Sequence, residues 1–151
     1  MKKIACAAFI VSTLALSVAG PVWAEDHEVQ MLNRGTEGVM VFEPSFLQIQ
    51  AGDTVTFVPT NPSHNAETIS SMLPDGAESF RGVLNQAVTV TFDQAGFYGV
   101  KCAPHYAAGM IALIDVGDGD SVNGETARAA RHPGRARQRM TALFEQFDTE
   151  N

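Results

Sequence analysis

Cysteine is scarce in this chain of 151 residues, which contains only Cys6 and Cys102. Cys6 lies in the N-terminal segment 1–24, MKKIACAAFIVSTLALSVAGPVWA, in which two lysines precede a long apolar run and Ala24 ends it. This pattern predicts a secretory signal peptide that is removed after Ala24, because the apolar run is too short for a stable membrane span. The mature chain, residues 25–151, then keeps a single cysteine and can form no internal disulfide.

Basic residues are also few. The sequence has 10 lysines and arginines against 17 aspartates and glutamates, a formal net charge of −7, which becomes −9 when Lys2 and Lys3 leave with the signal peptide. Such a negative chain is a poor partner for nucleic acid or for an anionic membrane surface, so we expect neither. Internal repeats and low-complexity tracts are absent as well, and the 127 residues of segment 25–151 predict one domain with its own core.

Short β-rich runs separated by turn residues fill the mature chain up to about residue 117. Alternating apolar residues in TVTFV (54–58) and VTVTF (88–92) predict strands with one buried face. The turn sequences at 51–53 and 94–96 predict hairpin-like connections. Together these runs predict an antiparallel β-sandwich over residues 25–117. The expected strand segments are EVQMLN, GVMVFEP, SFLQIQAGD, TVTFVPTNP, AVTVTFDQAG, FYGVKC and MIALIDVGD.

The composition changes after the sandwich, where Gly-Asp-Gly-Asp (117–120) predicts a linker. Asn123 is a suitable N-cap and predicts that a helix follows it. A second helix is predicted by one apolar stripe at positions i, i+3, i+4 and i+7. The stripe consists of Met140, Leu143, Phe144 and Phe147. Because each helix is too short to be stable alone, we expect both, within 123–148, to pack on the sandwich. A further short helix is expected around 78–83.

The lone Cys102 lies in the segment KCAPHYAAGM, residues 101–110, which joins two predicted strands. In an oxidising compartment an unpaired thiol is buried and inert, is paired with a partner chain, or binds a metal. His105 and Met110 belong to the same segment. Since a loop between adjacent strands brings its ends together, Cys102 and Met110 can face one point while His105 folds over it. A Cys–His nucleophile is an alternative, but the sequence offers no recognisable orienting partner or oxyanion site.

His64 can supply a second imidazole, because TVTFVPTNPSHN is a strand that runs into a turn at the same end of the sandwich. Two imidazoles, a thiolate and a thioether suit a type 1 copper ion, whereas zinc more often has cysteine or histidine in the fourth place. Copper would also keep the thiolate occupied in an oxidising compartment. We expect Asn65, next to His64, to tie the two ligand loops together or to donate a hydrogen bond toward the sulfur.

The motif Cys-x2-His-x4-Met, with a histidine 38 residues upstream, resembles the cupredoxins. The segments MVFEPSFLQIQAGDTVTF and KCAPHYAAGMIALIDVGD are similar in particular to the pseudoazurins, whose two C-terminal helices the plastocyanins lack. The resemblance implies an all-β, cupredoxin-like Greek-key sandwich with one copper ion. The implied ligands are His64, Cys102, His105 and Met110. It also implies a monomeric periplasmic electron carrier, not an enzyme, that transiently donates single electrons to a redox partner. The implied partners are the copper-containing nitrite reductase of denitrification and c-type cytochromes.

Pseudoazurins carry a basic ring around an exposed copper-binding histidine, and this ring meets an acidic patch on the reductase. Three residues of this chain match ring positions: Arg34, Arg81 and Lys101. The ring is thin, since Pro62 stands where related chains often carry a lysine. An apolar rim suited to a small, transient contact is expected beside His105. It consists of Pro104, Tyr106 and Met40. The alternative interpretation of the three charges is ordinary solvated surface.

Three further alternatives stay open at the level of sequence. A copper chaperone or storage protein would expose its ligands for transfer, whereas three of the four candidates here share one short loop. An electron carrier of the same kind could also serve another redox enzyme or a cytochrome. Finally, cleavage after Ala24 would create a free amine which, with two amides and the imidazole of His27, could chelate Cu(II) in a square plane. The simpler interpretation of His27 is an exposed surface residue.

Overall fold

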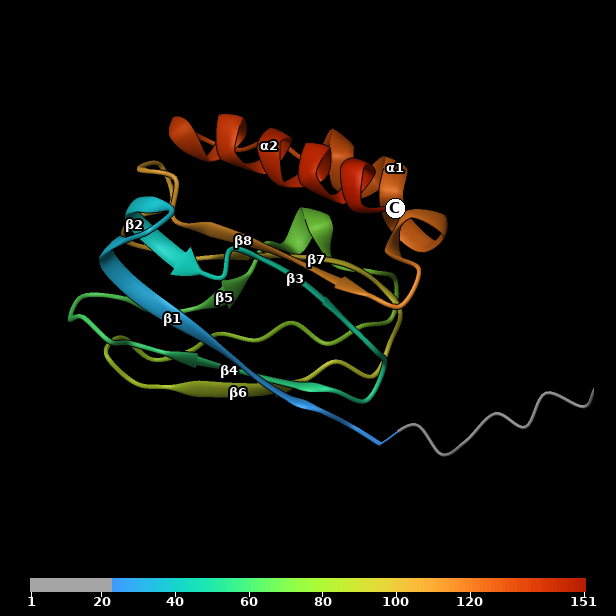
Figure 1. Cartoon of the computed structure of the whole chain (residues 1–151), viewed down its shortest axis with the longest axis horizontal. Coiled ribbons are helices and arrows are strands. Elements are labelled where there is room, and N and C mark those ends of the chain that lie inside the picture. Colours follow the sequence, from blue (N-terminus) through green and yellow to red (C-terminus); the bar gives the residue numbers. More distant parts are fainter. Residues whose placement is uncertain (1–22) are drawn as a thin grey trace, which may run out of the picture.

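The computed structural model describes residues 23–151, so the predicted signal peptide lies almost entirely outside the described residues. The described chain forms two four-stranded sheets, with strand orders β2-β1-β4-β6 and β3-β8-β7-β5 (Figure 1). This is the predicted two-sheet sandwich with two C-terminal helices. The strands are β1 (Asp26–Gly35), β2 (Gly38–Glu43), β3 (Phe46–Ile49), β4 (Thr54–Val58), β5 (Glu67–Thr68), β6 (Val88–Thr91), β7 (Gly96–Lys101) and β8 (Ile111–Val116).

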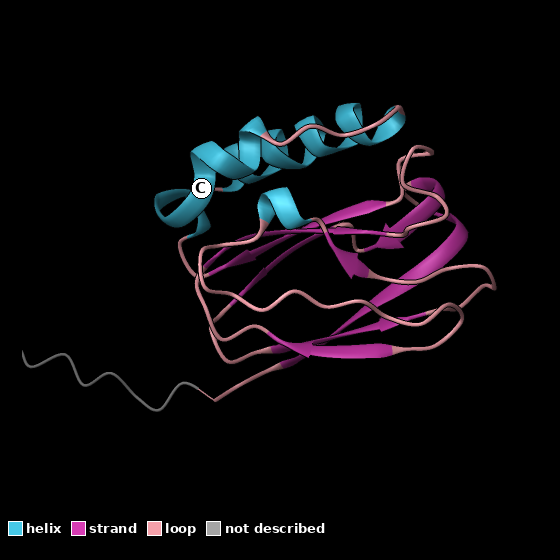
Figure 2. Ribbon diagram, turned by 180° about the vertical axis from the view of Figure 1, so that it is seen from behind, coloured by secondary structure: helices cyan, strands magenta, loops and turns pink. Residues whose placement is uncertain are grey.

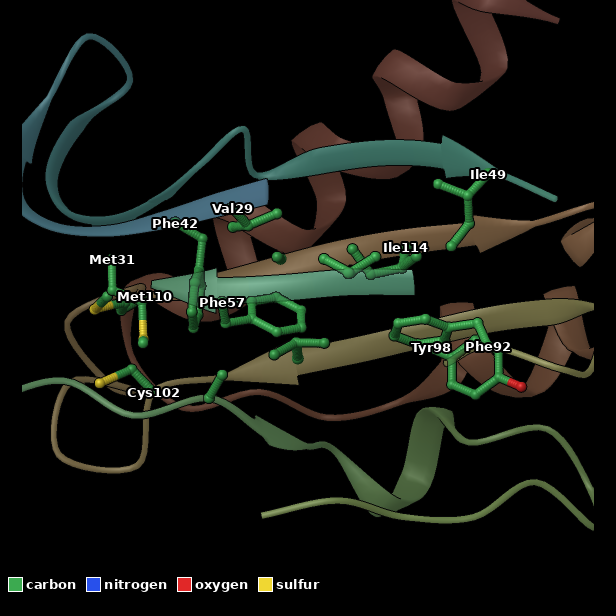
Figure 3. Close-up of a cluster of buried hydrophobic side chains, with 14 of the residues drawn as sticks. Val29, Met31, Phe42, Ile49, Phe57, Phe92, Tyr98, Cys102, Met110 and Ile114 are labelled. Atoms are coloured by element: carbon green, nitrogen blue, oxygen red, sulfur yellow. The ribbon is translucent and has the colours of Figure 1, made fainter. Parts of the chain in front are cut away.

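Alternating apolar side chains fill the space between the two sheets. In β4, Val55 and Phe57 are buried while the threonines are only partly covered, as the period of two predicts. The ring of Phe57 meets that of Phe42 edge to face at 5.9 Å between centroids. Figure 3 shows this core running between the sheets, with Cys102 and Met110 together at one end of it. The candidate metal ligands are therefore set into the end of a packed core.

The sandwich differs from the predicted antiparallel arrangement at two strand pairs. β1 runs parallel to β4, and β3 runs parallel to β8. The turns at 51–53 and 94–96 lead from one sheet to the other, so the prediction of hairpin-like connections there was wrong. The pairs that are both antiparallel and consecutive in the chain are β1–β2 and β7–β8. Turn residues mark a reversal of the chain but do not say which sheet the next strand joins.

Two helices cover the outer face of the sheet that contains β7 and β8 (Figure 2): α1 (Gly119–Ala129) and α2 (Arg135–Glu150). The predicted apolar stripe of α2 is buried against this sheet. The ring of Phe97 in β7 meets Phe144 at 5.2 Å and Phe147 at 4.9 Å. Because β8 then has packed layers on both faces, all of its residues are buried. Within residues 23–151, no helix combines the length and the hydrophobicity needed to cross a bilayer.

One local helix prediction is wrong, and another gains a turn that the sequence did not predict. Residues 78–83 contain no helix; a short 3-10 turn, η1 (Ser70–Met72), lies earlier in the same connection. α1 starts at Gly119, but Asn123, with a φ of −140° and a ψ of 22°, divides it at a kink, so a helix does follow Asn123 as predicted. The Asn123 side chain instead pairs with the backbone of Phe97, accepting its N–H at 2.7 Å and donating to its carbonyl at 3.0 Å. A residue expected to cap its own helix therefore fastens that helix to β7.

Candidate metal centre

The loop between β7 and β8, residues 102–110, is called the ligand loop below. Its ends are held together because the Cys102 N–H donates to the Met110 carbonyl at 3.0 Å. Two further hydrogen bonds hold the middle of the loop close to its ends. The His105 N–H donates to the Cys102 carbonyl at 3.2 Å, and the Met110 N–H donates to the His105 carbonyl at 3.1 Å. The loop thus places its three candidate ligands around one point at the end of the core.

His64, Cys102 and His105 direct their donor atoms at one another. The Cys102 Sγ atom lies 3.7 Å from His64 Nδ1 and 3.6 Å from His105 Nδ1, and the two nitrogens are 3.2 Å apart. Metal bonds of about 2.0 Å to imidazole nitrogen and about 2.3 Å to thiolate sulfur in a tetrahedral site separate ligand atoms by about 3.3 to 3.6 Å. The three side chains therefore fit a single bound metal ion.

Met110 is fully buried, and its side chain lies near Cys102 at the same end of the core (Figure 3). Its thioether is a soft, weak ligand, and the three stronger donors come from the other side chains. A set of two imidazoles, one thiolate and one thioether suits copper in both of its oxidation states and is unusual for zinc. The donor chemistry therefore favours copper over zinc.

His64 is oriented by Asn33, a residue that the sequence did not single out. The Asn33 Oδ1 atom lies 2.8 Å from His64 Nε2, so the proton belongs on Nε2 and Nδ1 presents its lone pair to the site. Burial, followed by the charge of His105, lowers the pKa of His64. Both effects keep the imidazole neutral, which is the form that binds a metal.

Asn65 links the two segments that hold the ligands. Its Oδ1 atom accepts the Ala103 N–H at 2.9 Å, and its Nδ2 donates to the Gly82 carbonyl at 3.2 Å. Burial raises the pKa of the Cys102 thiol, while backbone N–H groups of Asn65 and His105 directed at the sulfur lower it. A metal ion would take the place of the thiol proton.

His105 is the half-buried member of the set; the other three candidate ligands are buried. Beside it, Pro104 is exposed and Tyr106 is half-buried. The Nζ atom of Lys101 lies 5.1 Å from the centre of the Tyr106 ring. Pro104 and Tyr106 are therefore the chain neighbours of the candidate ligand that is not fully buried, and the Tyr106 hydroxyl lies 2.7 Å from His132 Nδ1.

The basic residues are arranged less simply than the ring prediction assumed. Glu67 pairs with two of them, at 3.3 Å from Lys101 Nζ and 3.1 Å from Arg81 Nε. Arg34 is exposed in the β1–β2 hairpin, where half-buried Met40 packs against the sandwich core. Glu67 thus removes one unit from the positive charge that these residues would otherwise present.

Comparison with known proteins decides the family. A family model described as copper binding proteins of the plastocyanin/azurin family matches residues 29–117. The chain belongs to this family. It is 47% identical over 133 residues to the pseudoazurin of Paracoccus pantotrophus, covering 88% of this chain and 91% of that protein. It is 50% identical over 139 residues to a putative pseudoazurin of Rhizobium leguminosarum bv. viciae, covering 91% of each.

The structural comparison agrees. The crystal structure of pseudoazurin from Methylobacterium extorquens AM1 matches with a TM-score of 0.77 at 43% identity, covering 81% of this chain and 98% of that one. Pseudoazurins and plastocyanins are electron-transfer proteins, not enzymes. The predicted pseudoazurin resemblance, the cupredoxin fold and the copper cofactor are therefore confirmed, and the chain is a type 1 copper electron carrier of the plastocyanin/azurin family.

Proposed function

We propose that His64, Cys102, His105 and Met110 bind the single copper ion of this carrier, and that the protein works in the periplasm as an electron donor to a copper-containing nitrite reductase. One observation supports the ligand assignment above all. The two Nδ1 atoms and the Cys102 sulfur lie 3.2 to 3.7 Å apart, at separations that one metal ion would impose.

The chain's own residues prepare this site for electron transfer. Asn33 fixes the ring of His64, and Asn65 holds the ligand loop against the segment that contains His64. Met110 and Cys102 are set into the rigid sandwich core, where little can rearrange. Copper, when bound, supplies a one-electron couple whose two states both accept these ligands. Electron exchange is then fast because the cage barely changes.

The electron would leave through the edge of His105, the candidate ligand that is not fully buried. Exposed Pro104 and half-buried Tyr106, next to it in the ligand loop, would supply an apolar rim. A rim of this kind favours a small contact that dissociates readily after transfer. Lys101 adds positive charge beside Tyr106, and exposed Arg34 and Arg81 would add more, which suits a partner with an acidic docking patch. The Glu67 pairs limit this charge, so we expect only moderate steering.

The periplasmic location rests on the predicted signal peptide at 1–24, cleaved after Ala24, and the mature unit is residues 25–151. The alternative of a copper chaperone or storage protein is less well supported. Cys102, His64 and Met110 are fully buried, whereas a protein that hands copper to another protein must let the acceptor's ligands reach the metal.

Rapid mixing of the copper(I)-loaded protein with candidate oxidants tests the partner assignment. We expect fast single-electron oxidation by copper-containing nitrite reductase, with a rate that falls moderately as salt rises. A c-type cytochrome mixed under the same conditions is the control for a different partner. Oxidation by the cytochrome alone, with no reaction with the reductase, would contradict the proposal.

A further inference from the structure

The second half of the ligand loop is held by the C-terminal helical segment. The Arg135 N–H, at the start of α2, donates to the Ala107 carbonyl at 3.0 Å. The hydroxyl of Tyr106 lies 2.7 Å from Nδ1 of His132, in the turn before α2. In Figures 1 and 2 the N-terminal end of α2 lies beside the loop that leads into β8. The connection between His105 and Met110 is thus fastened from outside the sandwich.

Arg139 makes the most extensive of these contacts. Its Nη1 atom donates to the carbonyls of Gly109 and Met40, both at 2.8 Å, and its Nη2 atom donates to the carbonyl of Val39 at 2.9 Å. One guanidinium therefore joins α2, the β1–β2 hairpin and the ligand loop. The Gly109 carbonyl belongs to the peptide that leads directly into Met110, so the bond acts on the backbone of a candidate ligand.

The backbone around Arg139 is shaped to admit it. Gly109 has a φ of +100°, and a Cβ atom there would lie 3.0 Å from Arg139 Cδ, so a side chain at this position would be both strained and crowded. Met40 also has a positive φ, of 50°, which is uncommon for a residue with a side chain. Two unusual backbone conformations thus present their carbonyls to the same side chain.

We propose that Arg139 is a positioning residue: it fixes the Gly109–Met110 peptide and thereby the distance of the Met110 thioether from the metal. This inference rests on the proposed copper site. The potential and colour of type 1 sites depend on their axial ligand, so a contact from α2 would help to set both. Arginine suits the task because its rigid planar fork holds several acceptors at once, whereas lysine offers a single flexible ammonium.

Three variants test this role: Arg139→Ala, Arg139→Lys and the control Arg137→Ala, which removes the same charge from an exposed position of the same helix. In the metal-free protein, amide hydrogen exchange at Gly109 and Met110 should become at least about tenfold faster in Arg139→Ala, with β7 and β8 unaffected. Arg139→Lys should show a smaller increase, and Arg137→Ala none. In the copper(II) forms, the ratio of the visible absorption bands and the reduction potential should shift most in Arg139→Ala, less in Arg139→Lys and not at all in Arg137→Ala.

The inference is overturned if exchange, spectrum and potential in both Arg139 variants match those of Arg137→Ala, even where the melting temperature falls, because Arg139 would then be only a structural brace. Should Arg139→Ala fail to fold, Arg139→Lys decides by the same readouts. If the wild-type protein binds copper without a thiolate band, the copper proposal fails separately, while exchange in the metal-free protein still decides whether Arg139 holds the loop.

Discussion

The Nε2 atom of His64 lies 2.8 Å from the Oδ1 atom of Asn33, and this bond determines which ring nitrogen faces the sulfur of Cys102. The two residues come from different segments, since Asn33 is in β1 and His64 follows β4. β1 and β4 are neighbours in the same sheet, which brings the asparagine alongside the imidazole. The sheet therefore sets the tautomer of a candidate ligand.

Replacement of Asn33 by leucine should weaken metal binding. The buried Nε2–H of His64 would lose its acceptor, at a cost of about 1 to 3 kcal/mol, and the imidazole could rotate or change tautomer. We expect metal affinity to fall by roughly 10- to 100-fold. Competition with a chromophoric chelator measures this. Asn33→Asp keeps an acceptor and should retain most of the affinity; equal affinities for the leucine and wild-type proteins would refute the orienting role.

Substitution of Glu67 by glutamine should raise the reduction potential. Glu67 acts on the Cys102 sulfur through its negative charge, which favours the more positive, oxidised state of the site. Loss of one nearby charge corresponds to about 1 kcal/mol, which is about 40 mV for one electron. The variant also frees Lys101 and Arg81, so its reaction with an acidic partner should become faster and more sensitive to salt.

Voltammetry and rapid mixing measure these two effects. Glu145→Gln, an exposed change of the same charge on α2, is the matched control. A potential and a salt dependence that are the same in both variants would show that Glu67 has no special influence on the site.

Stability at acidic pH should depend on Asp53. The N–H groups of Glu25 and Gln50 each donate to this buried carboxylate at 2.8 Å, and they lower its pKa below the usual value of 3.8. The stabilisation is therefore complete above pH 3.8 and is lost as the pH falls through the lower pKa of the folded state. Asp53→Asn should reduce the free energy of unfolding at pH 7 by about 1 to 3 kcal/mol and flatten its acid dependence.

Urea unfolding at neutral and acidic pH measures this effect, with exposed Asp93→Asn as the control. An unchanged acid dependence in Asp53→Asn would contradict the assignment. The same carboxylate bears on the N-terminal chelation hypothesis, because the Nε2 atom of His27 lies 3.2 Å from Asp53. A square-planar Cu(II) chelate at residues 25–27 would have to break these contacts and the pairing of β1 with β4.

The sequence predicted the parts of the site that depend on neighbouring positions. Cys102, His105 and Met110 lie within one loop, and the strands around that loop have clear alternation. The local sequence pattern was therefore enough to predict that these three side chains meet at one point. His64 could be added because a strand visibly ends beside it. The apolar stripe around Phe144 was predictable for the same reason, because its helical spacing can be recognised without knowing which surface the helix packs against.

The residues that the sequence missed act across long separations. Asn33 reaches His64 only because β1 lies parallel to β4, and periodicity does not determine strand order. Arg139 is 99 residues from Met40, and its contact depends on how α2 is oriented over the sandwich. The Glu67 pairs were hidden because β5 has only two residues and gives no alternating pattern.

An optical and EPR spectrum of the copper(II)-loaded protein, compared with that of Cys102→Ala, tests the ligand assignment most directly. Thiolate coordination in a site of two imidazoles and a thioether should give an intense visible absorption band, which Cys102→Ala should abolish. Asp93→Asn, an exposed change outside the ligand set, should leave the band in place. A colourless, redox-silent copper complex, or a band that persists without Cys102, would contradict the account.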